Sequence, residues 1–456
     1  MMSVSRWAAV GLSVVVSAVG AGPLDPPPGP VAPTGKPLAE IEPRIAINAT
    51  NTPGDNDSTP SLFQIAQPGS YYLAADTVVP EGLIGIEVAA TTGSVTIDLN
   101  GFRLQGTGVV AGAHGIDLGR ANNVTIRNGS IIGFGGYGIL GPNSDSCRLE
   151  DLRVQQSREA GARLGSGAIV TRCEFSSNGL GNGANTVGCE VGLTSVVSSS
   201  IFRNNLGDGL HADDGCTVTD CAARSNAHAG IAMGVAGTVR NCTARENLIN
   251  GFAVGPHSTV RDCVSYLNTG YGFGGGASIT FSGCNARDNT GNGFSGGAGT
   301  NFHDCIAAGN DGVGINANLQ AVVDGCTASN NQGAGISCGG TITNNHVQFN
   351  FVDGIVASSS ALVSGNSCNN NGVGTGVTTG ANIRVTAFNV RVENNTCTGA
   401  DLGIASDVSN CIIIRNTCSS NTTNYSVPAG ASIGTIINLS GGIDITTSNS
   451  FANFEY

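Results

Sequence analysis

The sequence predicts an all-β protein in which short coils stack into a solenoid, and three observations support this prediction. Six cysteines recur at intervals of 21 residues. Each is followed by an asparagine five residues later and by a glycine nine residues later. The chain contains 69 glycines and only 11% charged residues, which suits narrow turns and stacked sheets better than helices. A repeat of this length indicates units that bury their apolar side on their neighbours, here one coil per repeat. The six cysteines are Cys221, Cys242, Cys263, Cys284, Cys305 and Cys326.

The repeat extends on both sides of the strictly periodic stretch. A glycine followed by an apolar residue, as in Gly230-Ile231, recurs earlier in the chain at spacings of 21 to 27 residues and again later. We therefore expect about 14 coils over residues 111–425. Residues 41–110 are expected to form an N-terminal cap with the first strands, and residues 426–456 a C-terminal cap. Such caps cover the open ends of a solenoid core.

The N-terminus is typical of a secretion signal. Arg6 precedes an apolar run from Trp7 to Val19, and small residues follow up to Ala21. We expect residues 1–21 to be a signal peptide and residues 22–40, rich in proline, to be an extended linker. A retained lipid-facing anchor is the alternative for the first segment. No second apolar run is long enough to span a bilayer, so a secreted, periplasmic or cell-surface location is expected.

The 15 cysteines of an exported chain would ordinarily suggest a disulfide framework. Residues one period apart lie about 4.8 Å apart on adjacent strands, but their parallel side chains fit the torsion of a disulfide poorly. We therefore expect buried free thiols that fill the core. Bridges between Cys216 and Cys221, or between Cys411 and Cys418, remain open.

The repeat resembles a known superfamily. The recurring pattern G-[ILF]-x-V … V-x-N-C … N looks like the right-handed parallel β-helix superfamily that includes pectate lyases. The phrases QPGSYYLAADTVVPEG, VTIDLNGFRLQG and NSFANFEY resemble a group of exported bacterial β-helix proteins. The resemblance covers residues 41–456 and implies a single-domain right-handed parallel β-helix. It also implies that the asparagine column forms an internal ladder of hydrogen-bonded amides.

Enzymes of this superfamily usually act on the outer face of one sheet, and we interpret the glycine-plus-apolar strands as that sheet. The residue after each inward apolar side chain points outward. In the N-terminal half these outward positions hold Arg163, Glu190 and His211 on three successive coils, and Asp213 follows two residues after His211. In the C-terminal half they are mostly alanine, glycine and serine.

These four residues are our candidate catalytic site. A carboxylate and an imidazole can act as acid and base, paired carboxylates suit glycoside hydrolysis, and an arginine can neutralise a uronate carboxylate. The longer coil between Gly161 and Gly188 is expected to supply a groove wall. The alternative is ordinary charge pairing across an exposed sheet face.

Two weaker features remain. A second outward column, formed by Arg224, Arg245, Tyr266 and Arg287, could bind an acidic glycan or could be a solvated stripe. Asp55 and Asp57 could supply half of a Ca²⁺ loop, although such a pair is more typical of a solvated turn. No cofactor is otherwise implied, and Ca²⁺ stays open.

Two functions follow from these features. The first is an exported protein that interacts with a polysaccharide, as a lyase or hydrolase of an acidic glycan. The second is a non-catalytic surface or adhesion solenoid, favoured by the bare outward face and the scarcity of lysine. The net charge of −12 argues against nucleic acid or an anionic membrane as partner. The sequence indicates no oligomeric state.

Overall fold

A computed structural model describes residues 43–456, except 90–92, 109, 182–185, 374–379 and 443–448. The expected signal peptide and linker, residues 1–40, lie outside the described residues. The chain divides into two units after Pro43, and the second unit, Arg44–Tyr456, contains the coils. Within the described residues there is no α-helix, and hence none that could cross a membrane.

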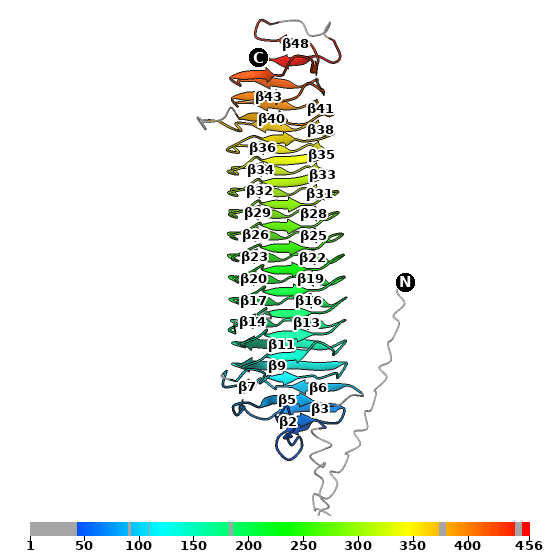
Figure 1. Cartoon of the computed structure of the whole chain (residues 1–456), viewed down its shortest axis with the longest axis vertical. Coiled ribbons are helices and arrows are strands. Elements are labelled where there is room, and N and C mark those ends of the chain that lie inside the picture. The colour runs from blue at the N-terminus through cyan, green and yellow to red at the C-terminus, as the bar shows by residue number, and fades with distance from the viewer. Residues whose placement is uncertain (1–42, 90–92, 109, 182–185, 374–379, 443–448) are drawn as a thin grey trace, which may run out of the picture. The chain divides into compact units, whose positions relative to one another are not determined.

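The coils stack along one axis, and each contributes short strands to three parallel ladders (Figure 1). Neighbouring coils are in register, as when Leu210, Val218 and Ala223 pair with Ile231, Val239 and Ala244 of the next coil. The fold is therefore the predicted parallel β-helix. Long strands take part in more than one ladder where the chain runs through a corner without a break.

Ladder 1, the sheet expected to carry the site, consists of β2 (Ser61–Ile65), β5 (Ile84–Val88), β8 (Ile116–Asp117), β10 (Ile139–Gly141), β12 (Ala162–Leu164), β15 (Cys189–Val191), β18 (Leu210–Ala212), β21 (Ile231–Met233), β24 (Phe252–Val254), β27 (Phe273–Gly275), β30 (Phe294–Gly296), β33 (Ile315–Asp324), β35 (Ile336–Thr343), β37 (Ile355–Ala357), β40 (Ala381–Val385), β43 (Leu402–Ser406) and β46 (Thr423–Ser426).

Ladder 2 shares β33 and β35 and otherwise consists of β1 (Ile45–Ile47), β3 (Gly69–Leu73), β6 (Val95–Asp98), β9 (Val124–Ile132), β11 (Arg148–Gln155), β13 (Ile169–Thr171), β16 (Val196–Ser198), β19 (Thr217–Thr219), β22 (Thr238–Arg240), β25 (Thr259–Arg261), β28 (Thr280–Ser282), β31 (Asn301–His303), β38 (Leu362–Ser364), β41 (Val390–Glu393), β44 (Cys411–Ile414) and β47 (Ser432–Ile433).

Ladder 3 shares β9 and β11 and otherwise consists of β4 (Thr77–Val78), β7 (Arg103–Gln105), β14 (Glu174–Ser176), β17 (Ile201–Arg203), β20 (Ala222–Arg224), β23 (Thr243–Arg245), β26 (Val264–Tyr266), β29 (Asn285–Arg287), β32 (Ile306–Ala308), β34 (Thr327–Ser329), β36 (His346–Gln348), β39 (Ser367–Asn369), β42 (Thr396–Thr398), β45 (Thr417–Ser419), β48 (Ile436–Asn438) and β49 (Asn453–Glu455).

The described residues form about 18 turns, a slightly larger number than the predicted total of about 14 coils. The strands within residues 41–110 already pair in the same ladders as the later coils, as Ile86 of β5 does with Ile116 of β8. Further along, Asn382 occupies the place of the glycine before Ile383, so that coil carries no glycine marker. Counting the glycine marker therefore missed coils near both ends.

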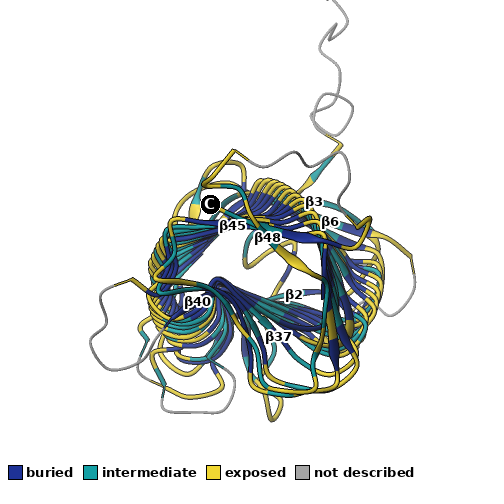
Figure 2. Cartoon of the chain, turned by 90° about the horizontal axis from the view of Figure 1, so that it is seen from above, coloured by how far each residue is buried: buried dark blue, intermediate teal, exposed yellow. Residues whose placement is uncertain are grey.

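Buried residues recur along the stacked strands (Figure 2), and they include the apolar and amide columns. Phe273 stacks between Phe252 and Phe294, with ring centroids 4.7 and 4.8 Å apart. The predicted asparagine ladder is confirmed: the Asn268 side-chain N–H donates to Asn289 Oδ1 at 2.9 Å, and Asn268 Oδ1 accepts from Asn247 at the same distance. These side chains are buried in the coil interior.

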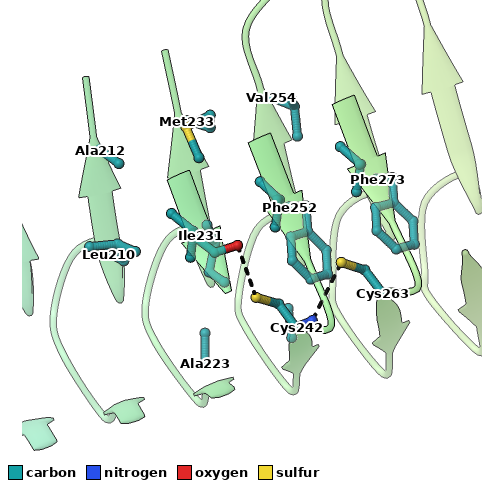
Figure 3. Packing of buried hydrophobic residues seen from close by; sticks show 14 of the residues in the cluster. Leu210, Ala212, Ala223, Ile231, Met233, Cys242, Phe252, Val254, Cys263 and Phe273 are labelled. Carbon is teal, nitrogen blue, oxygen red and sulfur yellow. Dashed lines mark hydrogen bonds between the residues drawn. The ribbon is translucent and has the colours of Figure 1, made fainter. Parts of the chain in front are cut away.

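All 15 cysteines are buried free thiols, as expected. Along the strict repeat they stack on successive coils beside the aromatic column (Figure 3), and the Cys242 backbone N–H lies 3.5 Å from Cys263 Sγ. Burial raises the pKa of the Cys173 thiol to about 12, which keeps that thiol protonated and unreactive. Neither Cys216 with Cys221 nor Cys411 with Cys418 is bridged.

The glycine column has a steric cause. A Cβ at Gly230 would lie 2.7 Å from the Asn247 side-chain nitrogen and 2.8 Å from the Gly251 carbonyl oxygen of the next coil. Real Cβ atoms do not approach that closely, so the amide ladder and the coil stacking require glycine there. The glycine and asparagine columns of the sequence therefore depend on each other, because both lie at the same corner of the coil.

Candidate functional site

The outer face of ladder 1 carries the predicted residues in one row. On β12, β15 and β18 the two end residues are buried and the middle residue is partly exposed. The middle residues are Arg163, Glu190 and His211, which pair directly across neighbouring strands. Asp213 follows β18 with its side chain 47% exposed. Arg163, Glu190 and His211 therefore lie next to one another along the solenoid axis, and Asp213 lies beside His211 on the same coil.

Arg163 and Glu190 form an ion pair. Arg163 Nε lies 3.1 Å from Glu190 Oε1, and both side chains are partly exposed. A cross-strand pair of this kind is worth up to about 1 kcal/mol. In this pair one oxygen of the Glu190 carboxylate is occupied, and the charge of the Arg163 guanidinium is neutralised.

His211 lies between two carboxylates. Its Nδ1 is 3.5 Å from Asp208 Oδ2, and its Nε2 is 3.7 Å from Asp213 Oδ1. Asp208 is fixed in turn, because its Oδ1 accepts a hydrogen bond from the Ala229 backbone N–H at 2.9 Å. The hydrogen bond that His211 donates to the Asp208 carboxylate raises the pKa of His211, and burial of the ring opposes that rise. The imidazole thus keeps its proton to a higher pH than a free histidine.

Sequence reasoning missed Asp208. It lies in the turn before β18 rather than on the strand, so the alternation of the strand does not place it. Its position three residues before His211 was the available signal. As a group that holds the imidazole by its Nδ1, Asp208 is a positioning residue.

A shallow groove begins at His211 and runs along the next coils. Its volume is about 480 Å³, and the outward residues Ala232, Ala253, Gly274 and Ser295 of successive strands line it. Successive small residues leave a hollow where larger side chains would stand. The face expected to be chemically bare is therefore also a concave one.

Asn250 and Tyr271 form part of the groove lining at the corner that precedes ladder 1. The Tyr271 backbone N–H donates to Asn250 Oδ1 at 2.9 Å, and the Tyr271 side chain remains 41% exposed. These two residues do not belong to the longer coil expected to supply a wall. That coil, between Gly161 and Gly188, includes residues 182–185, which lie outside the described residues.

Upstream of Arg163 the row continues with Leu140 and Asp117, and His114 and Tyr137 lie at the corner that precedes these strands. The Tyr137 backbone N–H donates to His114 Nδ1 at 3.1 Å. Burial lowers the pKa of His114. Burial raises the pKa of Tyr137, while a hydrogen bond with Arg163 opposes that rise. The pKa values of His114 and His211 are therefore shifted in opposite directions.

The described ranges hold no group of three or more His, Cys, Asp or Glu side chains placed to bind a metal ion. The candidate half-loop at Asp55 and Asp57 stabilises a turn instead. Asp55 Oδ1 accepts from both the backbone N–H and the hydroxyl of Ser61 at 3.0 Å, and Asp57 Oδ1 accepts from the Thr59 N–H. The carboxylate oxygens of these two aspartates therefore accept hydrogen bonds from within the chain.

The fold and this outer face define the class of protein. The family model for the right-handed β-helix region matches residues 114–269 and 257–396, more than half of the chain. The chain therefore belongs to the right-handed β-helix family. No curated protein matches the sequence.

Several solved structures are similar at low identity. The Dettilon tailspike protein is 12% identical, with 91% of this chain and 69% of that chain covered and a TM-score of 0.33. A tailspike mutant of E. coli bacteriophage HK620, in complex with a pentasaccharide, is 12% identical over 92% and 79%, with a TM-score of 0.35. The A-module of the Azotobacter vinelandii mannuronan C-5 epimerase AlgE4 is 13% identical over 80% and 90%, with a TM-score of 0.29. Similarity at this level carries no information about substrate.

Proposed function

We propose that this chain is an exported protein that binds a polysaccharide along the ladder 1 groove and cleaves it at the His211 end. One observation carries the proposal: His211, the ionisable centre of the charged row, also lines the groove. A chain bound over Ala253 and Gly274 would extend toward the imidazole and the carboxylates beside it. Export rests on the N-terminal sequence, and the localisation is secreted, periplasmic or cell-surface.

In this proposal His211 is the general acid. Its raised pKa favours the imidazolium near neutral pH. His211 would give its proton to the glycosidic oxygen as the bond to the anomeric carbon breaks, and the bonding electron pair would stay on that oxygen. Asp208 would hold the ring through Nδ1 while Nε2 faces the substrate side.

A carboxylate then completes hydrolysis. Asp213, or the Glu190 oxygen that faces away from Arg163, would take a proton from a water molecule whose oxygen adds to the anomeric carbon. Hydrolysis is favoured over β-elimination because elimination requires a cation on the uronate carboxylate. The nearest guanidinium, on Arg163, is already paired with Glu190 at 3.1 Å.

Non-catalytic binding is the second candidate. An ion pair such as the one between Arg163 and Glu190 also forms across exposed sheet faces that have no catalytic role. If this pair is only structural, the groove would bind a glycan chain and the solenoid would act as an adhesion or surface rod.

A glycan panel separates these functions. Neutral and acidic polysaccharides would be incubated with the wild-type protein, and the products assayed for new reducing ends and for unsaturated ends. New reducing ends alone identify a hydrolase, and unsaturated ends identify a lyase. His211→Ala and Glu190→Ala should each reduce the rate by at least about a hundredfold.

His303→Ala is the matched control, because His303 is a partly exposed histidine beside a carboxylate, Asp324, on ladder 2. It should leave the rate unchanged. Binding without any product would support the adhesion function, and the absence of both binding and products across the panel would contradict the proposal.

A further inference from the structure

Ladder 3 carries a column of arginines on the outer face of successive coils. Arg203, Arg224 and Arg245 pair directly across β17, β20 and β23, and Tyr266 and Arg287 continue the column on β26 and β29. Adjacent parallel strands lie about 4.8 Å apart. Guanidinium groups stacked at that spacing repel one another, and like charges directly opposite destabilise a sheet.

Among the described residues, carboxylates pair with Arg203 and Arg245 of this column but with neither Arg224 nor Arg287. Arg203 is paired with Glu174, which also lies 3.8 Å from Arg153. Arg245 Nη1 lies 3.7 Å from Glu246 Oε1. Arg224, between them, has no ion pair and no side-chain hydrogen bond with any residue that the structure describes.

Two neighbouring contacts hold the guanidinium groups in place. Arg245 Nη1 donates to the Tyr266 hydroxyl at 2.8 Å, and its guanidinium carbon lies 5.9 Å from the Tyr266 ring centroid. Arg287 Nε donates to Asn285 Oδ1 at 2.9 Å. Orientation of this kind lowers the entropy lost when a guanidinium binds an anion.

The column also borders a hollow of about 350 Å³. The residues that line it are Glu174, Ile201, Arg203, Ala222, Arg224 and Arg245. Its small and apolar residues give access to the faces of the guanidinium groups. On a chain with a net charge of −12, this is a localised basic and concave surface.

We propose that the column Arg203–Arg224–Arg245–Arg287 is a second binding face, which holds an acidic polysaccharide lying along the solenoid axis. Guanidinium groups bind carboxylates and sulfates through paired N–H donors. Their repeat along the axis matches a linear polymer that carries an anionic group on its successive units. The face lies on a different sheet from the ladder 1 groove and binds whether or not the groove cleaves a glycan.

A polysaccharide accounts for this face better than a single-stranded nucleic acid. Non-specific single-strand binding combines a basic groove with several aromatic side chains on which bases stack. Among the described residues of the column Tyr266 is the only aromatic side chain, and its hydroxyl is engaged by Arg245.

The test is a titration at low ionic strength with polygalacturonate, with neutral dextran and poly(dT) as comparison ligands. Wild-type protein should bind polygalacturonate, more weakly as salt is added, and should bind dextran and poly(dT) at least about tenfold more weakly. The double variant Arg224→Ala/Arg245→Ala should lose at least about tenfold in polygalacturonate affinity, since each charge-assisted contact is worth that much or more.

Arg240→Ala/Arg261→Ala is the matched control. These arginines are exposed and pair across β22 and β25 on ladder 2. Their substitution removes the same charge from nearby coils. The control should bind within about twofold of wild type. Equal losses in the two double variants, no polygalacturonate binding by wild type, or stronger binding of poly(dT) would each overturn the proposal. A glycan panel that yields no cleavage products would leave it standing.

Discussion

The coils before and after His211 have the same interior and different outer faces. On ladder 1 the upstream coils present Arg163, Glu190 and His211, whereas the downstream coils present Ala232 and Ala253 at the same positions. Inside, the same amide ladder runs through both regions, from Asn178 and Asn205 to Asn268 and beyond.

This difference shows that the repeat constrains only one side of each strand. The inward positions must match the coil above and the coil below, so their residue types recur. The outward positions contact solvent and can vary without loss of stacking. The downstream residues are small, and the hollow that they leave next to the charged row makes the two regions one candidate site.

Substitutions in the shared interior should lower the free energy of unfolding more than substitutions elsewhere in either region. Phe273→Ala removes a ring that stacks on Phe252 and Phe294 and should cost about 3–5 kcal/mol of unfolding free energy. Urea unfolding followed by circular dichroism would measure the loss. Phe388→Ala, at a ring that is 55% exposed, should change the transition little. Similar shifts for both variants would refute the assigned interior.

Substitutions in the amide ladder should lower the free energy of unfolding by nearly as much. Asn268→Ala leaves the Asn247 amide without its acceptor and the Ala244 carbonyl without its donor, so we expect a loss of about 3 kcal/mol. Asn301→Ala, at an outward position of β31, is the matched control and should stay near wild type. A control variant as unstable as Asn268→Ala would show that the ladder has no special role.

The charged row should show its role in the pH profile. If protonated His211 is the acid, the cleavage rate falls as pH rises through its pKa, which the Asp208 hydrogen bond raises. Asp208→Asn removes that charge, so the alkaline limb should move to lower pH while binding of the glycan stays unchanged. Asp262→Asn, at an exposed turn of ladder 2, should not move the limb. An unmoved limb in Asp208→Asn would exclude His211 as the acid.

The fold was predictable because its constraints repeat in sequence. Gly230, Asn226 and Cys221 mark columns that stacking forces on every coil, and strand alternation placed Glu190 and His211 on one outer face. The coil count was not predictable from the glycine marker, since Asn382 replaces the glycine at one coil. Asp208 was missed because it lies in the turn before β18, where strand alternation does not give the direction of a side chain.

The groove could not be read from the sequence for a different reason. A hollow is an absence of side-chain volume over several coils, and a run of alanine and glycine gives no chemical signal of its own. Ala253 and Gly274 therefore looked like an empty face. Tyr271, which helps to line the groove, lies at the corner before β27, where strand alternation does not give the direction of a side chain.

The most direct test asks whether the bare groove and the charged row act as one site. Ala253→Trp fills the groove floor from an outward position, and Thr280→Trp places the same side chain on the outer face of ladder 2. For a glycan that wild type binds in the panel, Ala253→Trp should weaken binding by at least about tenfold and abolish cleavage, while Thr280→Trp behaves as wild type. Undiminished binding and cleavage in Ala253→Trp would contradict the account.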